Sequence, residues 1–272
     1  MKIINLIEDT SGNNNCIAEH GLSFYVETDR HKLLVDTGAT DAFLKNAELL
    51  GIDLNQVDTV ILSHGHYDHS GGILPFAEKN LKARIYMQKS AGEDYCSIRE
   101  TGVAYIGIDK KILELPQLEM VDGNAELDEE LSLFTNITGR EFWPAGNYRL
   151  KKRIDGELLQ DEFAHEQCLV IKQDGKRYLL SGCAHNGIIN ILERFRELYG
   201  GEPDVVISGF HMILPEYEED DIAMIQETAR RLTRMKTKFY SGHCTGERAF
   251  AVMKEIMGEQ LQAIHSGDKL EG

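Results

Sequence analysis

The sequence predicts an α/β protein in which two sheets are sandwiched between helices. Three observations support this fold class. Apolar runs of strand length alternate with segments that have helical apolar spacing. The order strand, strand, helix, strand, helix occurs twice along the chain, as expected for two packed layers of each kind. The chain has 272 residues, 42% of them hydrophobic, which is enough to bury a large core.

The first half begins with three short strands, and the turn at Asp29 and Arg30 joins the last two as a meander. A helix follows, closed by Gly51 as a left-handed cap, and an apolar run then has the length of a buried strand. The predicted strands are 1–8, 21–28, 31–38 and 57–64, and the predicted helix is 40–51.

The second half repeats this order. The segment 218–235 has acidic residues in its first turn and basic residues in its last, which complements a helix dipole. The predicted strands are 168–173, 176–182, 203–211 and 261–265, with 238–246 before the last helix, and the predicted helices are 186–201, 218–235 and 249–258.

Residues from about 93 to 165 have a poorer pattern, and we expect an irregular insertion there, either a lid over the site or an ordinary surface elaboration. Within it, GREFWPAGNYRLKKR (139–153) is basic and aromatic. Lys151 and Lys152 are predicted to attract an anionic substrate, and Trp143 or Phe142 to stack on a flat ring. The alternative is a solvated turn with an apolar anchor. The other cations of this stretch are Arg140, Arg149 and Arg153.

Charge and cysteine content limit the class of function. The formal net charge of −16 opposes nucleic-acid binding, which needs a clustered basic face. The amino terminus MKIINLIEDT has too short an apolar run for a signal peptide, and no later stretch is long enough to span a bilayer. The five cysteines are scattered and fit reduced thiols. We expect a cytoplasmic protein that acts on a small molecule, with no nucleic-acid or membrane partner.

The residues HGHYDH (64–69) place three histidines and an aspartate within six positions at the end of a predicted strand. His64 and His66 can reach one cation where the strand breaks into a turn, and Asp68 and His69 follow on the next turn. A lone histidine is usually solvated or hydrogen-bonded in a core. Four such residues at this spacing indicate a metal site instead, and they are enough to serve two metals.

This motif resembles the His-x-His-x-Asp-His signature of the metallo-β-lactamase superfamily. The segments HGLSF, SGCAHNGIINI, SGFH and GHCTG resemble the subgroup of 7,8-dihydropterin-6-yl-methyl-4-(β-D-ribofuranosyl)aminobenzene-5′-phosphate synthase-like proteins. The resemblance covers nearly the whole chain. It implies a single domain, residues 1–272, with the four-layer αββα sandwich of that superfamily, in which two mixed sheets have helices outside.

The resemblance also implies a set of ligands for two metal ions. The first ion would be bound by His64, His66 and a third histidine, for which we choose His185 because it follows a strand where the superfamily has its later ligands. The second ion would be bound by Asp68, His69 and His243. In LLVDTG, Asp36 would support the loop and fix the orientation of a ligand.

One position departs from the superfamily pattern. The usual bridging aspartate of a Gly-Asp dipeptide is replaced, because Gly182 is followed by Cys183. Cys183 is either a thiolate ligand or a small buried side chain, in which case a water alone bridges the metals.

Other histidines lie near the predicted site. His211 ends a predicted strand on the same edge and is interpreted as a substrate contact or as support for a ligand. His20 precedes the second strand and either overhangs the site to contact the substrate or has a plain surface role. His31, His165 and His265 lie beside turns or charged residues, and we expect structural roles for them.

Two divalent ions at such a site activate water for attack on an ester, amide or phosphoryl centre, and Asp68 is the predicted catalytic residue that steers this water. Zinc is favoured, with iron or manganese as alternatives. Flavo-diiron members of the superfamily have a carboxylate where this chain has His66, which opposes redox chemistry. We predict a hydrolase of a small, anionic, possibly phosphorylated substrate.

Two alternatives stay open. One is a transferase that condenses a dihydropterin-methyl diphosphate with an aminobenzene ribofuranosyl phosphate, in which the metals hold the leaving diphosphate. The other is a non-enzymatic module that binds a metal or a ligand.

Overall fold

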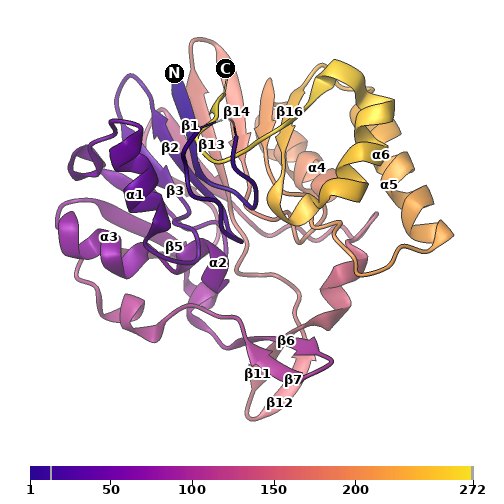
Figure 1. Ribbon diagram of the computed structural model, residues 1–272, viewed down its shortest axis with the longest axis horizontal. Helices are drawn as coiled ribbons and strands as arrows, with labels where there is room; N and C mark the ends of the chain where they lie inside the picture. Colours follow the sequence, from indigo (N-terminus) through magenta and orange to yellow (C-terminus); the bar gives the residue numbers. More distant parts are fainter. Residues whose placement is uncertain (13, 271–272) are drawn as a thin grey trace.

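The computed structural model of the protein describes residues 1–12 and 14–270. Two seven-stranded sheets lie face to face, with helices on the outer side of each (Figure 1). Helices α1 (Ala42–Leu49) and α3 (Ile73–Lys79) cover one sheet, and α4 (Ile188–Tyr199), α5 (Glu219–Leu232) and α6 (Glu247–Met257) cover the other. The predicted four-layer αββα sandwich is confirmed.

The first sheet is mixed, since β1, β2 and β3 pair antiparallel while β3, β4, β5 and β8 pair parallel. In spatial order its strands are β18 (Lys269–Leu270), β1 (Lys2–Ile7), β2 (Ser23–Glu27), β3 (Lys32–Val35), β4 (Thr59–Ile61), β5 (Arg84–Gln88) and β8 (Leu118–Val121).

The second sheet is also mixed, because β14 to β17 pair parallel and β9, β10, β13 and β14 pair antiparallel. In spatial order its strands are β17 (Leu261–Ala263), β16 (Lys238–Ser241), β15 (Val205–Ile207), β14 (Lys176–Leu180), β13 (Cys168–Gln173), β10 (Leu131–Phe134) and β9 (Ala125–Glu126).

Strand alternation divides the core into three parts. In β3, Leu33 and Val35 enter the core between the sheets, whereas Leu34 faces outward against the helices of its own half. Successive side chains of a strand point to opposite faces, so a continuous apolar run serves a sheet that is covered on both sides. This is why the strands of both halves read as apolar runs in the sequence.

Every strand and helix predicted for the two halves is present, with ends that differ by a few residues. The remaining short elements connect them. They are α2 (Tyr67–Ser70) and the 3-10 helices η1 (Leu54–Gln56), η2 (Lys89–Gly92), η3 (Lys110–Glu114), η4 (Ala145–Arg149), η5 (His243–Thr245) and η6 (Gly258–Gln260). No helix within the described residues is long and apolar enough to cross a membrane.

The expectation of an irregular insertion at 93–165 is wrong. Strand β8 extends the first sheet and β9 and β10 extend the second, so much of this segment belongs to the sandwich. The rest forms a separate four-stranded sheet, β12 (Glu157–Gln160), β11 (Leu150–Ile154), β6 (Tyr95–Arg99) and β7 (Gly102–Tyr105), at one end of the molecule (Figure 1). These strands are short and carry many charges, which hides their period in the sequence. The extent of the domain stays a prediction.

His31 connects the turn between β2 and β3 to two other loops. Its Nδ1 atom lies 3.0 Å from Oδ1 of Asp58, and its Nε2 atom lies 2.6 Å from Oδ2 of Asp128, which precedes β10 of the second sheet. Partial burial lowers the pKa of His31, but the hydrogen bonds to both carboxylates outweigh it and raise the pKa above 6.5. A protonated His31 therefore links the two sheets.

We expect this link to stabilise the fold fully below the unfolded pKa of His31 and to be lost as the pH rises through the higher folded pKa. Replacing His31 with Gln should lower the free energy of unfolding by about 1 kcal/mol near pH 6, and the difference should shrink toward about pH 9. Urea titrations over this range measure it. His265→Gln is the control, because Nδ1 of His265 contacts the Thr10 hydroxyl and no carboxylate. An equal loss at both pH values would contradict the link.

Candidate metal centre

The predicted ligands come together at one edge of both sheets, beyond the carboxyl ends of parallel strands. The loop after β4 carries HGHYDH, and the loops after β14, β15 and β16 carry the later histidines. Since parallel strands end at the same edge, residues far apart in sequence meet there. The predicted ligands are all buried, and they are His64, His66, Asp68, His69, Cys183, His185 and His243.

Asp36 fixes the HGHYDH loop from below. Its Oδ1 atom accepts the Ser63 backbone N–H at 2.7 Å, and its Oδ2 atom accepts the Ser63 hydroxyl and His69 Nδ1, each at 2.7 Å. Asp36 lies in the left-handed region at φ 57°, where aspartate is more tolerated than most residues. The loop packs so closely that a Cβ atom on Gly71 would lie 2.0 Å from the carbonyl oxygen of Ala39. The placement of Asp36 agrees with a ligand-orienting role.

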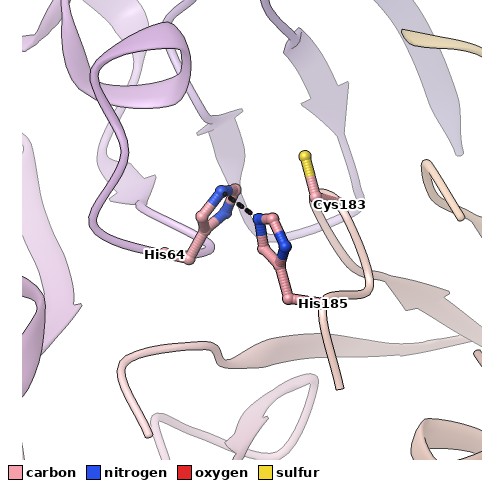
Figure 2. Close-up of side chains that lie close together, drawn as sticks. All are labelled: His64, Cys183 and His185. Atoms are coloured by element: carbon pink, nitrogen blue, oxygen red, sulfur yellow. Dashed lines mark hydrogen bonds between the residues drawn. The ribbon is translucent and has the colours of Figure 1, made fainter. Parts of the chain in front are cut away.

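Three groups of donor atoms share the Cys183 sulfur; one contains His211 and Cys244, and the other two consist of predicted ligands. Of these two, one is His64, Cys183 and His185, the other is His69, Cys183 and His243, and within each group all ligand atoms lie within 4.8 Å of one another. The Nε2 atoms of His64 and His185 are 3.3 Å apart, and Figure 2 shows these rings facing each other from the two halves of the chain. Cys183 Sγ lies 3.2 Å from His69 Nε2. Cys183 therefore occupies the place between the groups.

The other two predicted ligands border these groups. The ring of His66 lies 4.6 Å from that of His64 and 4.8 Å from that of His185, and its Nε2 atom is buried without a hydrogen bond in the described structure. Oδ2 of Asp68 lies 3.7 Å from His69 Nε2 and 3.4 Å from His243 Nε2. The predicted ligands His64, His66 and His185 therefore lie together on one side of Cys183. The predicted ligands Asp68, His69 and His243 lie together on the other side.

Burial sets the protonation of the cluster. Burial lowers the pKa of His64 and His185 well below the usual range, and it lowers the pKa of His66 to about 3. These rings are therefore neutral, which is the form that binds a metal. Burial also raises the pKa of the Cys183 thiol well above its usual range. A cation is then needed to make Cys183 a thiolate.

On the other side, charge pairing is stronger than burial. Burial raises the pKa of Asp68, but His69 and His243 outweigh it and hold this pKa far below the usual range. Burial lowers the pKa of His243, but hydrogen bonds to Asp68 and Asp9 raise it well above the usual range. Asp68 is therefore a carboxylate, and an ion bound by His243 would displace the proton that Asp68 and Asp9 favour on this ring.

Several polar residues that orient the ligands were missed from the sequence, and of these Glu8, Asn147 and Glu166 are buried while Asp9 is partly exposed. Glu166 accepts the backbone N–H of His185 at 2.6 Å, and Glu8 accepts that of His243 at 2.6 Å. The Oδ1 atom of Asn147 lies 3.1 Å from His185 Nδ1. The Oδ1 atom of Asp9 lies 2.6 Å from His243 Nδ1. The acidic pair Glu8 and Asp9 directly after β1 was the available signal, since β1 runs in the same direction as β3 two strands away and so ends at the same edge as the loop that carries Asp36.

His165, for which a structural role was predicted, lies behind the HGHYDH loop. Its Nδ1 atom accepts the backbone N–H of Gly65 at 2.9 Å, and its Nε2 atom lies 3.0 Å from Oδ2 of Asp161. His165 is completely buried. It therefore supports the backbone between the first two ligands.

A cavity of about 180 Å³ opens over the donor groups, and both predicted substrate histidines line it. His211 packs against His185 with ring centroids 4.2 Å apart, and its Nδ1 atom is buried without a hydrogen bond in the described structure. His20 lies at the mouth, where its Nε2 atom is 3.5 Å from Oδ2 of Asp68 and its Nδ1 atom is 2.9 Å from Oδ2 of Asp9. Both positions suit contact with a substrate, which stays a prediction.

The structure does not bring Trp143, Lys151 or Lys152 into this cavity. Trp143 packs against Phe163, whose ring stacks on His185, so it lies one ring behind the site. Lys151 donates to Gln160 on the neighbouring strand, and Lys152 forms an ion pair with Glu93. The sequence shows a cluster of basic residues, but it does not show that Lys151 and Lys152 are bound by Gln160 and Glu93. We therefore remove these three residues from the predicted substrate site.

Comparison with known proteins agrees with this geometry. The family model of the metallo-β-lactamase superfamily matches residues 17–139. A solved structure of a metal-dependent hydrolase of the β-lactamase superfamily is 32% identical, with a TM-score of 0.83, over 100% of this chain and 99% of that one. The chain belongs to the metallo-β-lactamase superfamily. Members of this superfamily are typically enzymes and usually bind divalent metals such as zinc.

Two further relatives are similar over almost their whole length. The 7,8-dihydropterin-6-methyl-4-(β-D-ribofuranosyl)-aminobenzene-5′-phosphate synthase of Methanocaldococcus jannaschii is 28% identical over 98% of this chain and 95% of its own. The structure of Zn²⁺-bound PqqB from Methylobacterium extorquens is 13% identical, with a TM-score of 0.58, over 100% of both chains. The second likeness concerns the fold alone.

The contacts of Asp36 lead to a prediction about metal affinity. Asp36→Asn keeps the shape of the side chain and tolerates the left-handed backbone, but it weakens the acceptor for His69 and Ser63. We expect metal affinity to fall about tenfold to a hundredfold, as for other residues that orient a metal ligand. Competition with a chelator, followed by mass-spectrometric metal analysis, measures this.

Asp174→Asn is the matched control. Asp174 also has a left-handed backbone, at φ 54°, but it lies in the turn between β13 and β14, away from the ligands. The control should bind metal like the wild type. Equal affinity in the Asp36 and Asp174 variants would show that Asp36 has no orienting role.

Proposed function

We propose that this protein is a metal-dependent hydrolase that acts on a small anionic substrate at a dinuclear centre. The observation that carries the proposal is the position of the Cys183 sulfur in two adjacent groups of buried histidine donors. One ion would be held by His64, His66 and His185, and the other by Asp68, His69 and His243. Cys183 would bridge them in place of the aspartate usual in this superfamily.

The residues present fit such ions. Ligand atoms placed tetrahedrally about 2.1 Å from a zinc ion lie about 3.4 Å from one another. The pairs His64–His185 and Cys183–His69 have separations of 3.3 and 3.2 Å. The buried Nε2 atom of His66, which has no hydrogen bond in the described structure, points to a missing partner of the same kind. Nitrogen, sulfur and carboxylate donors suit zinc best, and iron or manganese tolerate them.

Divalent ions bound there would polarise an ester and acidify a water molecule. The other contributions come from the chain. Asp68 accepts a hydrogen bond from the attacking water and so steers it. His20, whose pKa is raised mainly by its hydrogen bond to Asp9, lies 3.5 Å from Asp68 and can donate a hydrogen bond to the substrate at the mouth. His211 and His185 form the wall that excludes bulk water.

The size of the cavity favours hydrolysis of a small group. About 180 Å³ accommodates a phosphoryl or acyl group with a short substituent, whereas drug-sized ligands fill about 300–1,000 Å³. The similarity to a metal-dependent hydrolase at 32% identity over the whole chain also supports this reaction. A non-enzymatic module is a poorer account, because it gives no reason for so complete a set of buried ligands.

A transferase is the second candidate, and a specific feature favours it. An apolar pocket of about 550 Å³ lies beyond His243 and Ile213, which border both this pocket and the metal cavity. It could take a flat ring against Phe250, as the reaction of the similar synthase would require. In that reaction the ions would hold a leaving diphosphate and water would not react.

The bridging role of Cys183 is testable by substitution. Cys183→Ala should reduce the metal content from two ions per chain toward one, and the cobalt-substituted protein should lose sulfur-to-cobalt charge-transfer absorption in the near ultraviolet. Cys96→Ala is the control, because Cys96 is equally buried but lies on β6 outside the donor groups. Unchanged metal content and an unchanged cobalt spectrum in Cys183→Ala would refute the bridge.

Isotope labelling separates hydrolase from transferase. The metal-loaded protein is incubated with phosphate and carboxylate esters in ¹⁸O-labelled water, and separately with a dihydropterin-methyl diphosphate and its aromatic acceptor. A hydrolase places the label in the product, and His64→Ala should lower that turnover by at least about a hundredfold while the protein stays folded. Condensed product, with no label entering any ester, would reverse the choice.

A further inference from the structure

The small sheet presents one face to the metal cavity. Ser97 and Arg99 are two residues apart on β6, so their side chains share a face, and Leu150 of β11 pairs directly with Ser97. All three residues line the cavity together with the metal ligands. Lys151 pairs with Cys96 and therefore points to the opposite face. The sheet thus brings one cation, Arg99, to the mouth of the cavity.

Arg99 combines a place in the cavity lining with the absence of an ion pair. Lys152 is paired with Glu93 and Lys110 with Asp94, but no ion pair within the described part of the chain includes Arg99. Its neighbour is the hydroxyl group of Tyr67, which lies between the ligands His66 and Asp68 in sequence and is 39% exposed. In a chain with a formal net charge of −16, an arginine without a carboxylate partner at the mouth of a cavity requires an explanation.

We propose that Arg99 and Tyr67 form a subsite for a second phosphoryl group of the substrate, held while the reacting group lies at the metal centre. This inference rests on the proposed function only in placing the reacting group of the substrate at the metal centre. A guanidinium offers two parallel N–H donors to an anion, and the Tyr67 hydroxyl adds a third donor from another element. Three donors from different directions match the oxygens of a tetrahedral phosphoryl group, whereas the guanidinium alone satisfies a planar carboxylate. The substrate class is an organic diphosphate or a bisphosphorylated small molecule.

Binding of inorganic anions isolates this subsite from catalysis. Isothermal titration calorimetry of the metal-loaded protein compares inorganic phosphate, which needs only the metal centre, with diphosphate, which can reach both places. The wild type should bind diphosphate more tightly than phosphate. In Arg99→Gln we expect diphosphate affinity to fall about tenfold to a hundredfold while phosphate affinity and metal content stay unchanged. Tyr67→Phe should cause a smaller loss of the same kind.

Arg153→Gln is the matched control, since Arg153 lies on β11 of the same small sheet but does not line the cavity. It should bind both anions like the wild type. Malonate, a dicarboxylate, should bind Arg99→Gln almost as tightly as it binds the wild type. If Arg99→Gln lost as much affinity for malonate as for diphosphate, the subsite would bind any anion and the phosphoryl proposal would be wrong.

Equal loss of phosphate and diphosphate in Arg99→Gln, no loss of either, or failure of the metal-loaded wild type to prefer diphosphate would overturn the proposal. Failure of the hydrolase proposal gives a different result, because no ester would then take up labelled oxygen while the preference for diphosphate still depended on Arg99.

Discussion

The metal centre depends on buried carboxylates that accept backbone N–H groups of the ligand-bearing loops. Asp36 accepts the N–H of Ser63, Glu166 that of His185 and Glu8 that of His243, at 2.6 to 2.7 Å. These loops follow the carboxyl ends of strands, so no neighbouring strand accepts their N–H groups. A buried N–H group without an acceptor costs about 1–3 kcal/mol of folding free energy. Each carboxylate therefore fixes the backbone of one loop and, through it, the position of a ligand. Bound ions would add to a frame that the protein has already built.

The same burial that holds the loops keeps the donors ready for a metal. His64 and His185 could not lie 3.3 Å apart if both rings carried a charge, and burial lowers the pKa of each so that they stay neutral. Buried polar atoms such as His66 Nε2 have no hydrogen bond in the described structure. Burying such atoms without hydrogen bonds costs folding free energy, which an apolar core of the same volume would avoid. Local features that lower stability in this way are typical of functional sites.

The sequence was sufficient for the sandwich, which follows from apolar runs and helix ends. The spacing of HGHYDH and the resemblance to the superfamily supplied the predicted ligands, most of which the structure brings together. The sequence was insufficient where function depends on tertiary contact. Glu166 and Asn147 act on residues far along the chain, and nothing in their own surroundings marks them. For Lys151 and Lys152 the sequence suggested a function that the contacts do not support. Their basic surroundings predicted a patch that attracts an anionic substrate, but Lys151 lies on the face of β11 away from the cavity and Lys152 forms an ion pair with Glu93.

The relatives indicate where specificity arises in this fold. A metal-dependent hydrolase and a synthase resemble this chain to a similar degree, at 32% and 28% identity, over nearly its whole length. One fold therefore accompanies two reactions, and the choice between them depends on what surrounds the ions. In this protein the small sheet contributes Arg99 and Leu150 to the cavity, and His243 and Ile213 separate it from a larger pocket. We infer that these walls determine whether water or a second organic molecule reaches the reacting group, and that they would thereby select the reaction at the metal centre.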